Sequence, residues 1–472
     1  GEPGRETPHL DQMAREGLLV PSMYASAPLC SPARAALLTG RLPVRNGFYS
    51  DNDPGRNAYT PQEIVGGIAD WELLLPELLK QKNYTSAIIG KWHLGHQDQY
   101  LPLKHGFDYF FGSTNCHFGP YDDVKKPNIP VFRNEKMVGR YYEEFSIADN
   151  ESNFTRLLTE EAVAFIKDQE GKEDPFFLYW TPDSTHAKTY SSAAYRGTSG
   201  RGSYGSAVQE LDAGAGAILQ QLRDSGLEND TLVVFTSDNG AALVSKFDGG
   251  SNGPLLCGKQ TTFEGGMRVP GIVWWPGTIE PNTVTQQVIS QMDFLPTFLQ
   301  LAGIELPQDR LFDGIALGQS LLNTDLHIAR PVFLYRGDIL MAVRRGPYKM
   351  HLWTWNAPQS ELDDGIDFCP GQRQENITTS FQFDHRDSPL LYDIVADPAE
   401  RYLISENSEE YKDIVPKLQQ IVGDHESDMV KGSPELNWCD TAVMHWAPPG
   451  CDELGKCLDV PESNPYRCVW DH

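Results

Sequence analysis

The sequence predicts an α/β fold in which a mostly parallel sheet is flanked by helices and a smaller C-terminal α+β domain follows. Two observations support this prediction: short, uniformly apolar runs alternate with amphipathic helical segments, and polar residues follow each apolar run. Ligands bind beyond the carboxyl ends of the strands in such sheets, so those polar residues are candidate site residues. A length of 472 residues is enough for two or three domains.

Helix signals mark the first two predicted elements. Residues 8–16 form a predicted helix, with Thr7 as its N-cap and Gly17 beyond its end. Residues 31–38 form a second predicted helix with a body of alanine and leucine. Cys30 therefore lies at the N-terminus of a helix.

Three apolar runs are predicted strands: residues 85–90, 175–180 and 231–236. Amphipathic helix patterns over residues 157–166 and 208–222 fall between them, as in βα units. Polar residues of the kind found in active sites follow the three runs: Lys91 and His93, Asp183 and His186, and Asp238 and Asn239.

The pattern changes near residue 330. Shorter strand-like segments and one helix follow, which predicts a smaller antiparallel-sheet domain: residues 332–335, 340–343 and 390–392 as strands and 411–422 as the helix. Beyond residue 431 there is little periodicity, but four of the eight cysteines lie there. We therefore divide the chain into a main α/β domain (1–329), a smaller domain (330–431) and a disulfide-stapled meander (432–472).

The net charge is −26, from 39 basic and 65 acidic residues. Such a field repels nucleic acid and anionic lipid surfaces, so no nucleic-acid partner is expected and an anionic substrate would need a local cationic pocket. The apolar runs reach strand length only, so no membrane span is predicted.

Five Asn-X-Ser/Thr sequons and eight cysteines favour a secretory route. We expect glycosylation at the sequon asparagines, which are Asn83, Asn150, Asn153, Asn229 and Asn376. The sequence begins at Gly1 without a leader, so we expect that N-terminal residues were removed by processing or by truncation.

Two segments carry a recognisable pattern. Residues 30–34 read Cys-Ser-Pro-Ala-Arg and continue with Ala-Ala-Leu-Leu-Thr-Gly-Arg, and residues 89–93 read Ile-Gly-Lys-Trp-His. Both resemble signatures of the sulfatase family, in which the cysteine of a Cys-X-Pro-X-Arg pentapeptide is converted to formylglycine. Three further segments are similar to one member of that family: residues 56–67, 115–121 and 446–451. The resemblance implies an alkaline phosphatase-like sulfatase fold, maturation by the formylglycine-generating enzyme, a homodimer and a lysosomal location.

Sulfate ester hydrolysis needs a nucleophile at sulfur, neutralisation of charge on the sulfate oxygens and a proton for the leaving alcohol. A plain thiol would form a dead-end adduct, whereas a hydrated aldehyde has one hydroxyl to attack and a second to expel sulfate. Cys30 could instead be a buried or disulfide-bonded cysteine, but its sequence context favours modification. Arg34 lies one helical turn beyond Cys30, so both can face one pocket.

The resemblance implies six catalytic residues: Cys30, Arg34, Lys91, His93, His186 and Lys259. Arg34 would steady the hydrated formylglycine, and His93 would hold or deprotonate its second hydroxyl. Lys91 and Lys259 would clamp the sulfate, while His186 would donate to the same oxygens or protonate the leaving group. Substrate binding is expected from these last three residues together with Tyr59.

Asp238 and Asn239 follow a buried strand and offer two hard oxygen ligands for Ca²⁺. A simple turn is the alternative for these residue types. The resemblance favours Ca²⁺, with the modified Cys30 as a further ligand. It also implies two aspartates at the end of a first strand that precedes this sequence, so we expect residues 1–472 alone to bind Ca²⁺ weakly, dissolve poorly and lack activity.

Cysteine counting leaves seven cysteines once Cys30 is modified, so another must stay unpaired. The resemblance implies that this residue is Cys116. It also implies three disulfides: Cys257–Cys369, Cys439–Cys468 and Cys451–Cys457.

The resemblance implies an exo-acting lysosomal sulfatase that cuts the 6-sulfate from terminal N-acetylgalactosamine, and from galactose, in chondroitin and keratan sulfate. At lysosomal pH, protonated carboxylates and charged histidines would reduce repulsion of a polyanion, so activity should fall as pH rises. One alternative is an arylsulfatase of other preference, set by the loops around Tyr59 and Cys116. A phosphatase would need Ser or Thr at position 30 and a zinc-type ligand set. A third alternative is a catalytically incompetent, truncated form.

Overall fold

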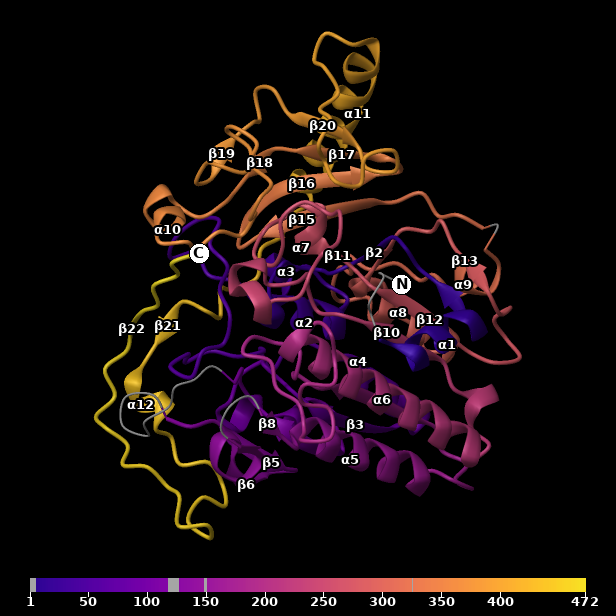
Figure 1. The fold of residues 1–472 in the computed structure, drawn as a ribbon, viewed down its shortest axis with the longest axis vertical. Helices are drawn as coiled ribbons and strands as arrows, with labels where there is room; N and C mark the ends of the chain where they lie inside the picture. The colour runs from indigo at the N-terminus through magenta and orange to yellow at the C-terminus, as the bar shows by residue number, and fades with distance from the viewer. Residues whose placement is uncertain (1–5, 118–126, 148–150, 325) are drawn as a thin grey trace.

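A computed structural model describes residues 6–117, 127–147, 151–324 and 326–472. The indigo-to-pink part of the chain forms two larger sheets and two smaller ones with helices around them, and the orange C-terminal domain lies at one end (Figure 1). The yellow C-terminal segment runs back along the side of the molecule (Figure 1). The described part of the chain contains no helix long and apolar enough to span a bilayer.

The first sheet has the strand order β6-β5-β4-β3-β9. Strands β4, β3 and β9 are parallel, with β9 at one edge of the sheet, whereas β5 and β6 form an antiparallel hairpin at the other edge. Ile88 packs into one hydrophobic cluster and Ile89 into another, because successive side chains of a strand point to opposite faces. The strands are β3 (Thr85–Gly90), β4 (Tyr109–Ser113), β5 (Pro130–Arg133), β6 (Lys136–Arg140) and β9 (Phe176–Thr181).

Helices cover this sheet where the sequence predicts them. The apolar side chains of α5 (Phe154–Asp168) and α6 (Gly202–Asp224) pack together in one cluster with α1 (Pro8–Glu16). The predicted N-cap Thr7 makes no capping hydrogen bond to the helix backbone; its hydroxyl contacts the Asp11 carboxylate instead.

The second sheet has the order β10-β12-β1-β13, and β10 pairs antiparallel with β12. The fold class is confirmed, but the two sheets are mixed rather than one mostly parallel sheet. Among the described residues, β9 and β10 each pair with a strand on one side only. A cleft of about 1740 Å³ lies between them, lined by apolar side chains that include Leu37, Leu178 and Val234. The strands are β1 (Leu18–Leu19), β10 (Val233–Thr236), β12 (Gly271–Trp274) and β13 (Thr283–Val284).

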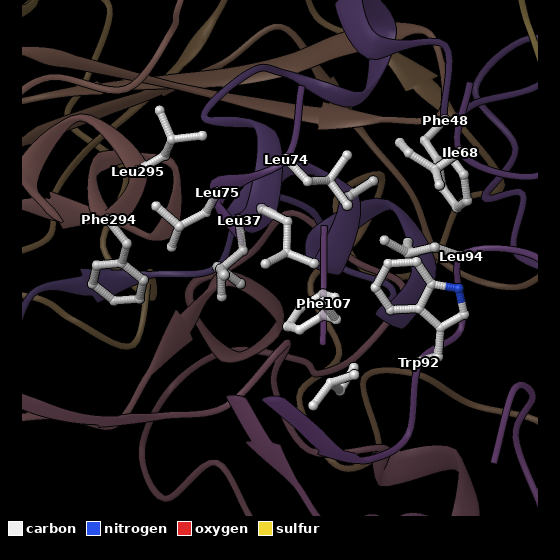
Figure 2. Close-up of a cluster of buried hydrophobic side chains, with 14 of the residues drawn as sticks. Leu37, Phe48, Ile68, Leu74, Leu75, Trp92, Leu94, Phe107, Phe294 and Leu295 are labelled. Atoms are coloured by element: carbon white, nitrogen blue, oxygen red, sulfur yellow. The ribbon is translucent and has the colours of Figure 1, made fainter. Parts of the chain in front are cut away.

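The helix that begins at Cys30 is embedded in the main core. All ten residues of α2 (Cys30–Thr39) are buried. Leu37 of this helix lies among side chains of α4 (Leu75–Leu79) and α8 (Phe294–Leu301), with Trp92 in the same cluster (Figure 2). Such packing makes α2 a rigid support for a site at its N-terminus.

The C-terminal domain is built on the antiparallel sheet β15-β16-β17-β20. Helix α11 (Glu409–Ser427) packs on it through Val415, Leu418 and Val422. The three predicted strands and the predicted helix are present as β15 (Pro331–Arg336), β16 (Ile339–Arg345), β20 (Leu390–Asp393) and α11. The fourth strand of this sheet, β17 (Tyr348–His351), was not predicted.

The remaining elements are short. The helices among them are α3 (Pro43–Asn46), α7 (Glu264–Met267), α9 (Gly318–Leu322), α10 (Gln359–Asp363) and α12 (Thr441–Met444). The strands are β2 (Met23–Tyr24), β7 (Ser146–Ile147), β8 (Glu151–Ser152), β11 (Arg268–Val269), β14 (Ile289–Ser290), β18 (Trp353–Thr354), β19 (Phe383–Asp384), β21 (Trp438–Cys439) and β22 (Tyr466–Arg467).

A fully buried ionic cluster joins the two domains. Lys349 of β17 lies 3.0 Å from a carboxylate oxygen of Glu264 in α7 and 3.0 Å from one of Glu400. Glu264 also contacts the Arg268 guanidinium at 2.7 Å and accepts a hydrogen bond of 2.6 Å from the Tyr24 hydroxyl. Contact between the two domains removes these charged side chains from water. Each of them has a partner of opposite charge in the cluster, which offsets the cost of burying it.

Candidate active site

Cys30 is the first residue of α2 and is buried. Leu29 before it is extended, and Gly40 ends the helix in the left-handed conformation, so the helix has defined limits. The backbone N–H groups at this N-terminus favour negative charge on the Cys30 side chain.

Lys91 and His93 follow β3, as predicted. Gly90 has φ 128°, and a Cβ there would lie 2.2 Å from the Thr181 carbonyl oxygen, so glycine is required where β3 and β9 end. The Lys91 N–H donates to that carbonyl at 2.9 Å. The Lys91 ammonium is buried and lies 2.7 Å from the Cys116 sulfur.

Lys259 and His186 complete the group around Cys30. The Lys259 ammonium lies 3.2 Å from the Cys30 sulfur and 3.1 Å from Nε2 of His186. The Cys116 sulfur lies 3.8 Å from the same His186 nitrogen. Residues from four distant parts of the chain thus converge on one small volume.

The electrostatics favour an anion at position 30. A hydrogen bond from Cys116, together with the Lys259 and Lys91 ammonium groups, lowers the pKa of the Cys30 thiol well below its usual value despite burial. Burial alone would lower the pKa of Lys91, but the two neighbouring sulfurs raise it. In a chain of net charge −26, this is the local cationic pocket that an anionic substrate requires.

The two histidines predicted to be catalytic, His93 and His186, differ from expectation in their charge. Burial and the Lys91 ammonium lower the pKa of His93 to about 3, and burial and the Lys259 ammonium lower the pKa of His186 to about 3. Both imidazoles are therefore neutral near pH 5. The prediction that these histidines become charged in an acidic compartment is wrong in the unmodified site, because they lie beside two cations that the sequence alone does not place there.

Arg34 contacts the end of β10 rather than the Cys30 sulfur. Its Nε and Nη2 lie 3.0 and 2.8 Å from Oδ2 of Asp238, and its Nη1 donates to the Lys91 carbonyl at 2.9 Å. The Asn239 amide lies 3.0 Å from Asp238 Oδ1 and 3.5 Å from the Cys30 sulfur.

The donor set beside Cys30 agrees with Ca²⁺ in type. Asp238 and Asn239 supply hard oxygens, whereas the cluster of Cys30, Cys116 and His186 supplies sulfur and nitrogen. Ca²⁺ takes about six to eight oxygen ligands. The described residues next to Cys30 therefore fit part of a Ca²⁺ shell.

Sequence analysis did not predict the contacts that support His93 and His186, although it named Asp183 and the 115–121 segment. His117 Nδ1 lies 2.6 Å from the Asp183 carboxylate, and the His117 ring contacts that of His186 edge-on at 5.4 Å. Nδ1 of His93 lies 3.0 Å from the Ser31 hydroxyl. The only sequence signals for these contacts were the position of Asp183 after a strand and of Ser31 inside the signature.

Tyr59 is half-buried, and its ring centroid lies 6.3 Å from that of His93. The predicted substrate-binding tyrosine thus lies beside His93, one of the predicted catalytic residues.

The structure contains the disulfides Cys257–Cys369, Cys439–Cys468 and Cys451–Cys457, and Cys30 and Cys116 lie outside them. Of the sequon asparagines, Asn83, Asn229 and Asn376 are exposed and Asn153 is half-buried. Asn150 lies outside the described residues, as do residues 118–121 of the 115–121 segment.

Comparison with known proteins agrees with this site. Residues 1–304 match the sulfatase family, and residues 328–459 match the C-terminal region of aryl-sulfatase. N-acetylgalactosamine-6-sulfatase of Mus musculus is 56% identical and that of Homo sapiens 55%, each covering 100% of this chain and 91% of the relative. Arylsulfatase A of Homo sapiens is 34% identical, covering 98% of this chain and 92% of the relative.

A solved structure gives the same result for the fold. The PsFucS1 sulfatase from Pseudoalteromonas sp. superposes with a TM-score of 0.74 at 29% identity, covering 90% of this chain and 86% of that one. Family matches over most of the chain and relatives above half identity agree with the Cys30 signature. The chain therefore belongs to the sulfatase family of sulfuric ester hydrolases.

Proposed function

We propose that this chain hydrolyses the 6-sulfate ester of terminal N-acetylgalactosamine, and of galactose, in chondroitin and keratan sulfate. The observation that carries the proposal is the convergence of Lys91, Lys259 and His186 on Cys30. The choice of substrate is supported by mammalian relatives that are named N-acetylgalactosamine-6-sulfatase and are 55–57% identical over the whole chain.

The nucleophile would be the side chain of residue 30 after conversion to formylglycine, which the sulfatase family generally uses. When hydrated, this group supplies one hydroxyl for attack on sulfur and a second for release of sulfate. Rigid packing of α2 fixes residue 30, and the lysine ammonium groups hold the ester with its sulfur facing that residue. Lys259, 3.2 Å from the Cys30 sulfur, would neutralise charge on the sulfate oxygens.

Lys259 and His186 together form an acid pair. Nδ1 of His186 lies 2.6 Å from the Ala187 carbonyl, which can only accept, so this nitrogen carries the proton of the neutral ring. Nε2 then accepts from the Lys259 ammonium at 3.1 Å. A proton passed from Lys259 through Nε2 would reach the leaving alcohol.

On the other side, His93 would accept a proton from the second hydroxyl. Its pKa of about 3 keeps the imidazole neutral above that pH, so the ring can accept a hydrogen bond from this hydroxyl, as a weak base.

Asp238 and Asn239 would hold Ca²⁺ together with the modified residue 30. Bound there, the ion would add positive charge next to the sulfate. Arg34 holds the Asp238 carboxylate in place at the end of β10.

The test is expression with a formylglycine-generating enzyme, followed by mass spectrometry of the residue 30 peptide and assay on a 6-sulfated galactoside. We expect formylglycine in the residue 30 peptide and, in the full-length protein, turnover; Cys30→Ala should show neither. Turnover of aryl sulfates without turnover of the sugar ester would favour an arylsulfatase of other preference, the second reading of this site. A lysosomal location and a homodimer are further parts of the proposal, to be checked by cell fractionation and light scattering.

A further inference from the structure

Tyr59 contacts an aromatic ring from the far end of the chain. The ring centroids of Tyr59 and Trp470 lie 5.5 Å apart at an angle of 58°. Trp470 is only 6% exposed and belongs to the main core, whereas Tyr59 is half-buried. Trp470 is therefore a buried support for a half-buried tyrosine ring that lies next to His93.

The segment of residues 468–472 (the 468–472 segment) is held in place at both of its ends. Cys468 is disulfide-bonded to Cys439, and its carbonyl accepts a hydrogen bond of 3.0 Å from the Asn52 amide. At the other end, the Asn57 N–H donates to the His472 carbonyl at 2.8 Å. Because Asn57 lies two residues before Tyr59, the segment fixes both the backbone and the ring of Tyr59.

The same segment is connected to the lysine that contacts Cys30. The Asn57 side-chain amide donates to the backbone carbonyl of Gln260 at 3.1 Å and to its side-chain oxygen at 2.8 Å. Gln260 directly follows Lys259 and is also held by the Arg336 guanidinium at 2.9 Å. These hydrogen bonds fix the position of the loop that carries Tyr59 relative to the loop that carries Lys259.

We propose that Trp470 is a positioning residue that fixes Tyr59 against the sugar ring of the substrate and so favours sugar sulfates over small aryl sulfates. An aromatic face packs well against the C–H face of a sugar, and it binds more tightly when its orientation is set in advance. Lys91 and Lys259 hold the sulfate, which both kinds of substrate carry. The inference rests on the proposed function, because it assumes a sugar ester as substrate.

The test compares Trp470→Leu with wild type on a 6-sulfated galactoside and on 4-nitrophenyl sulfate. We expect KM for the galactoside to rise about three- to tenfold, with kcat changed less than about twofold. Inhibition by inorganic sulfate, which has no ring for Tyr59 to contact, reports on the lysines and should stay the same, and KM for 4-nitrophenyl sulfate should rise less than KM for the galactoside. Trp470→Phe keeps a ring and should give a smaller KM shift on the galactoside alone.

Trp438 supplies the matched control, since it lies in the same meander but is 45% exposed and packs on Arg467. Trp438→Leu should match wild type on both substrates. In Tyr59→Leu, the further change Trp470→Leu should add nothing, because the support no longer has a ring to hold.

Equal KM shifts on both substrates, or no shift on the galactoside, would overturn the positioning role. If Trp470→Leu does not fold, the same comparison of KM on the two substrates is made with Trp470→Phe. Wild type that cuts 4-nitrophenyl sulfate but not the galactoside would instead contradict the proposed function, and this inference with it.

Discussion

Arg34 joins the signature helix to the end of β10, because its guanidinium lies 2.8 Å from the Asp238 carboxylate. The same guanidinium donates to the Lys91 carbonyl at 2.9 Å. One side chain thus holds together the helix that begins at Cys30, the candidate Ca²⁺ ligand and the end of β3. The arginine of the pentapeptide serves here as a positioning residue, in addition to any contact with the modified side chain.

Asp238→Asn should reduce kcat about 100- to 1000-fold, because it removes a hard anionic ligand and leaves the Arg34 charge without its carboxylate. The change lies outside the pentapeptide, so formylglycine content should be unaffected. Activity should require more Ca²⁺ than in wild type and should vanish in excess chelator. Steady-state kinetics over a Ca²⁺ titration measure this effect. Asp230→Asn, at the opposite end of β10, is the control, and wild-type kinetics for Asp238→Asn would exclude a metal role.

Lys259→Ala should weaken both substrate and inorganic sulfate binding and lower kcat about 100-fold or more, since the ammonium contacts residue 30 and His186. Loss of this cation also removes one cause of the lowered pKa of His186. Inhibition constants for sulfate and kcat on the galactoside are the measurements. Lys417→Ala removes an exposed lysine of α11 as a control. Unchanged sulfate inhibition in Lys259→Ala would rule out the sulfate-binding role.

Much of the local structure could be predicted from the sequence. Cys30 begins α2, and β3 and β10 end one to three residues before their candidate site residues, because caps, glycines and apolar runs are local signals. The catalytic set came from the family resemblance and not from periodicity.

Long-range features could not be predicted in this way. The contact of Trp470 with Tyr59 depends on a meander without periodicity, and the lowered pKa of His186 depends on a lysine from another loop. The division into two sheets was missed because an apolar run does not reveal which neighbour it pairs with.

Cys116 should be the one alkylatable cysteine in unreduced, unfolded protein that carries formylglycine at position 30. The other six cysteines form the three disulfides, and Cys116 lies outside them. In the folded enzyme, Cys116 is 7% exposed, so alkylation should be much slower. Peptide mapping after iodoacetamide treatment, with and without denaturant, measures both. Recovery of Cys116 in a disulfide-linked peptide would contradict the pairing.

Glu264→Gln should destabilise the protein at neutral pH and weaken the dependence of its stability on acid. Lys349, Arg268 and Arg344 outweigh burial, which alone would raise this pKa, and they hold the pKa of Glu264 at about 2, below its ordinary value of 4.5. A carboxylate with a lowered pKa stabilises the fold fully above its unfolded pKa, and this contribution is lost as pH falls from 4.5 through 2.

Breaking one partner of such a buried cluster costs about 3–5 kcal/mol in the free energy of unfolding. The cost should therefore be present at pH 7 and pH 5 and should shrink towards pH 2, where about half of the wild-type carboxyl is protonated. Urea unfolding of both proteins across this pH range measures the difference, and subtraction removes the other titrating groups that they share. Glu409→Gln, exposed at the start of α11, should leave the curve unchanged. If the difference between Glu264→Gln and wild type were the same at pH 7 and pH 2, the ionised carboxylate would not be what holds the two domains together.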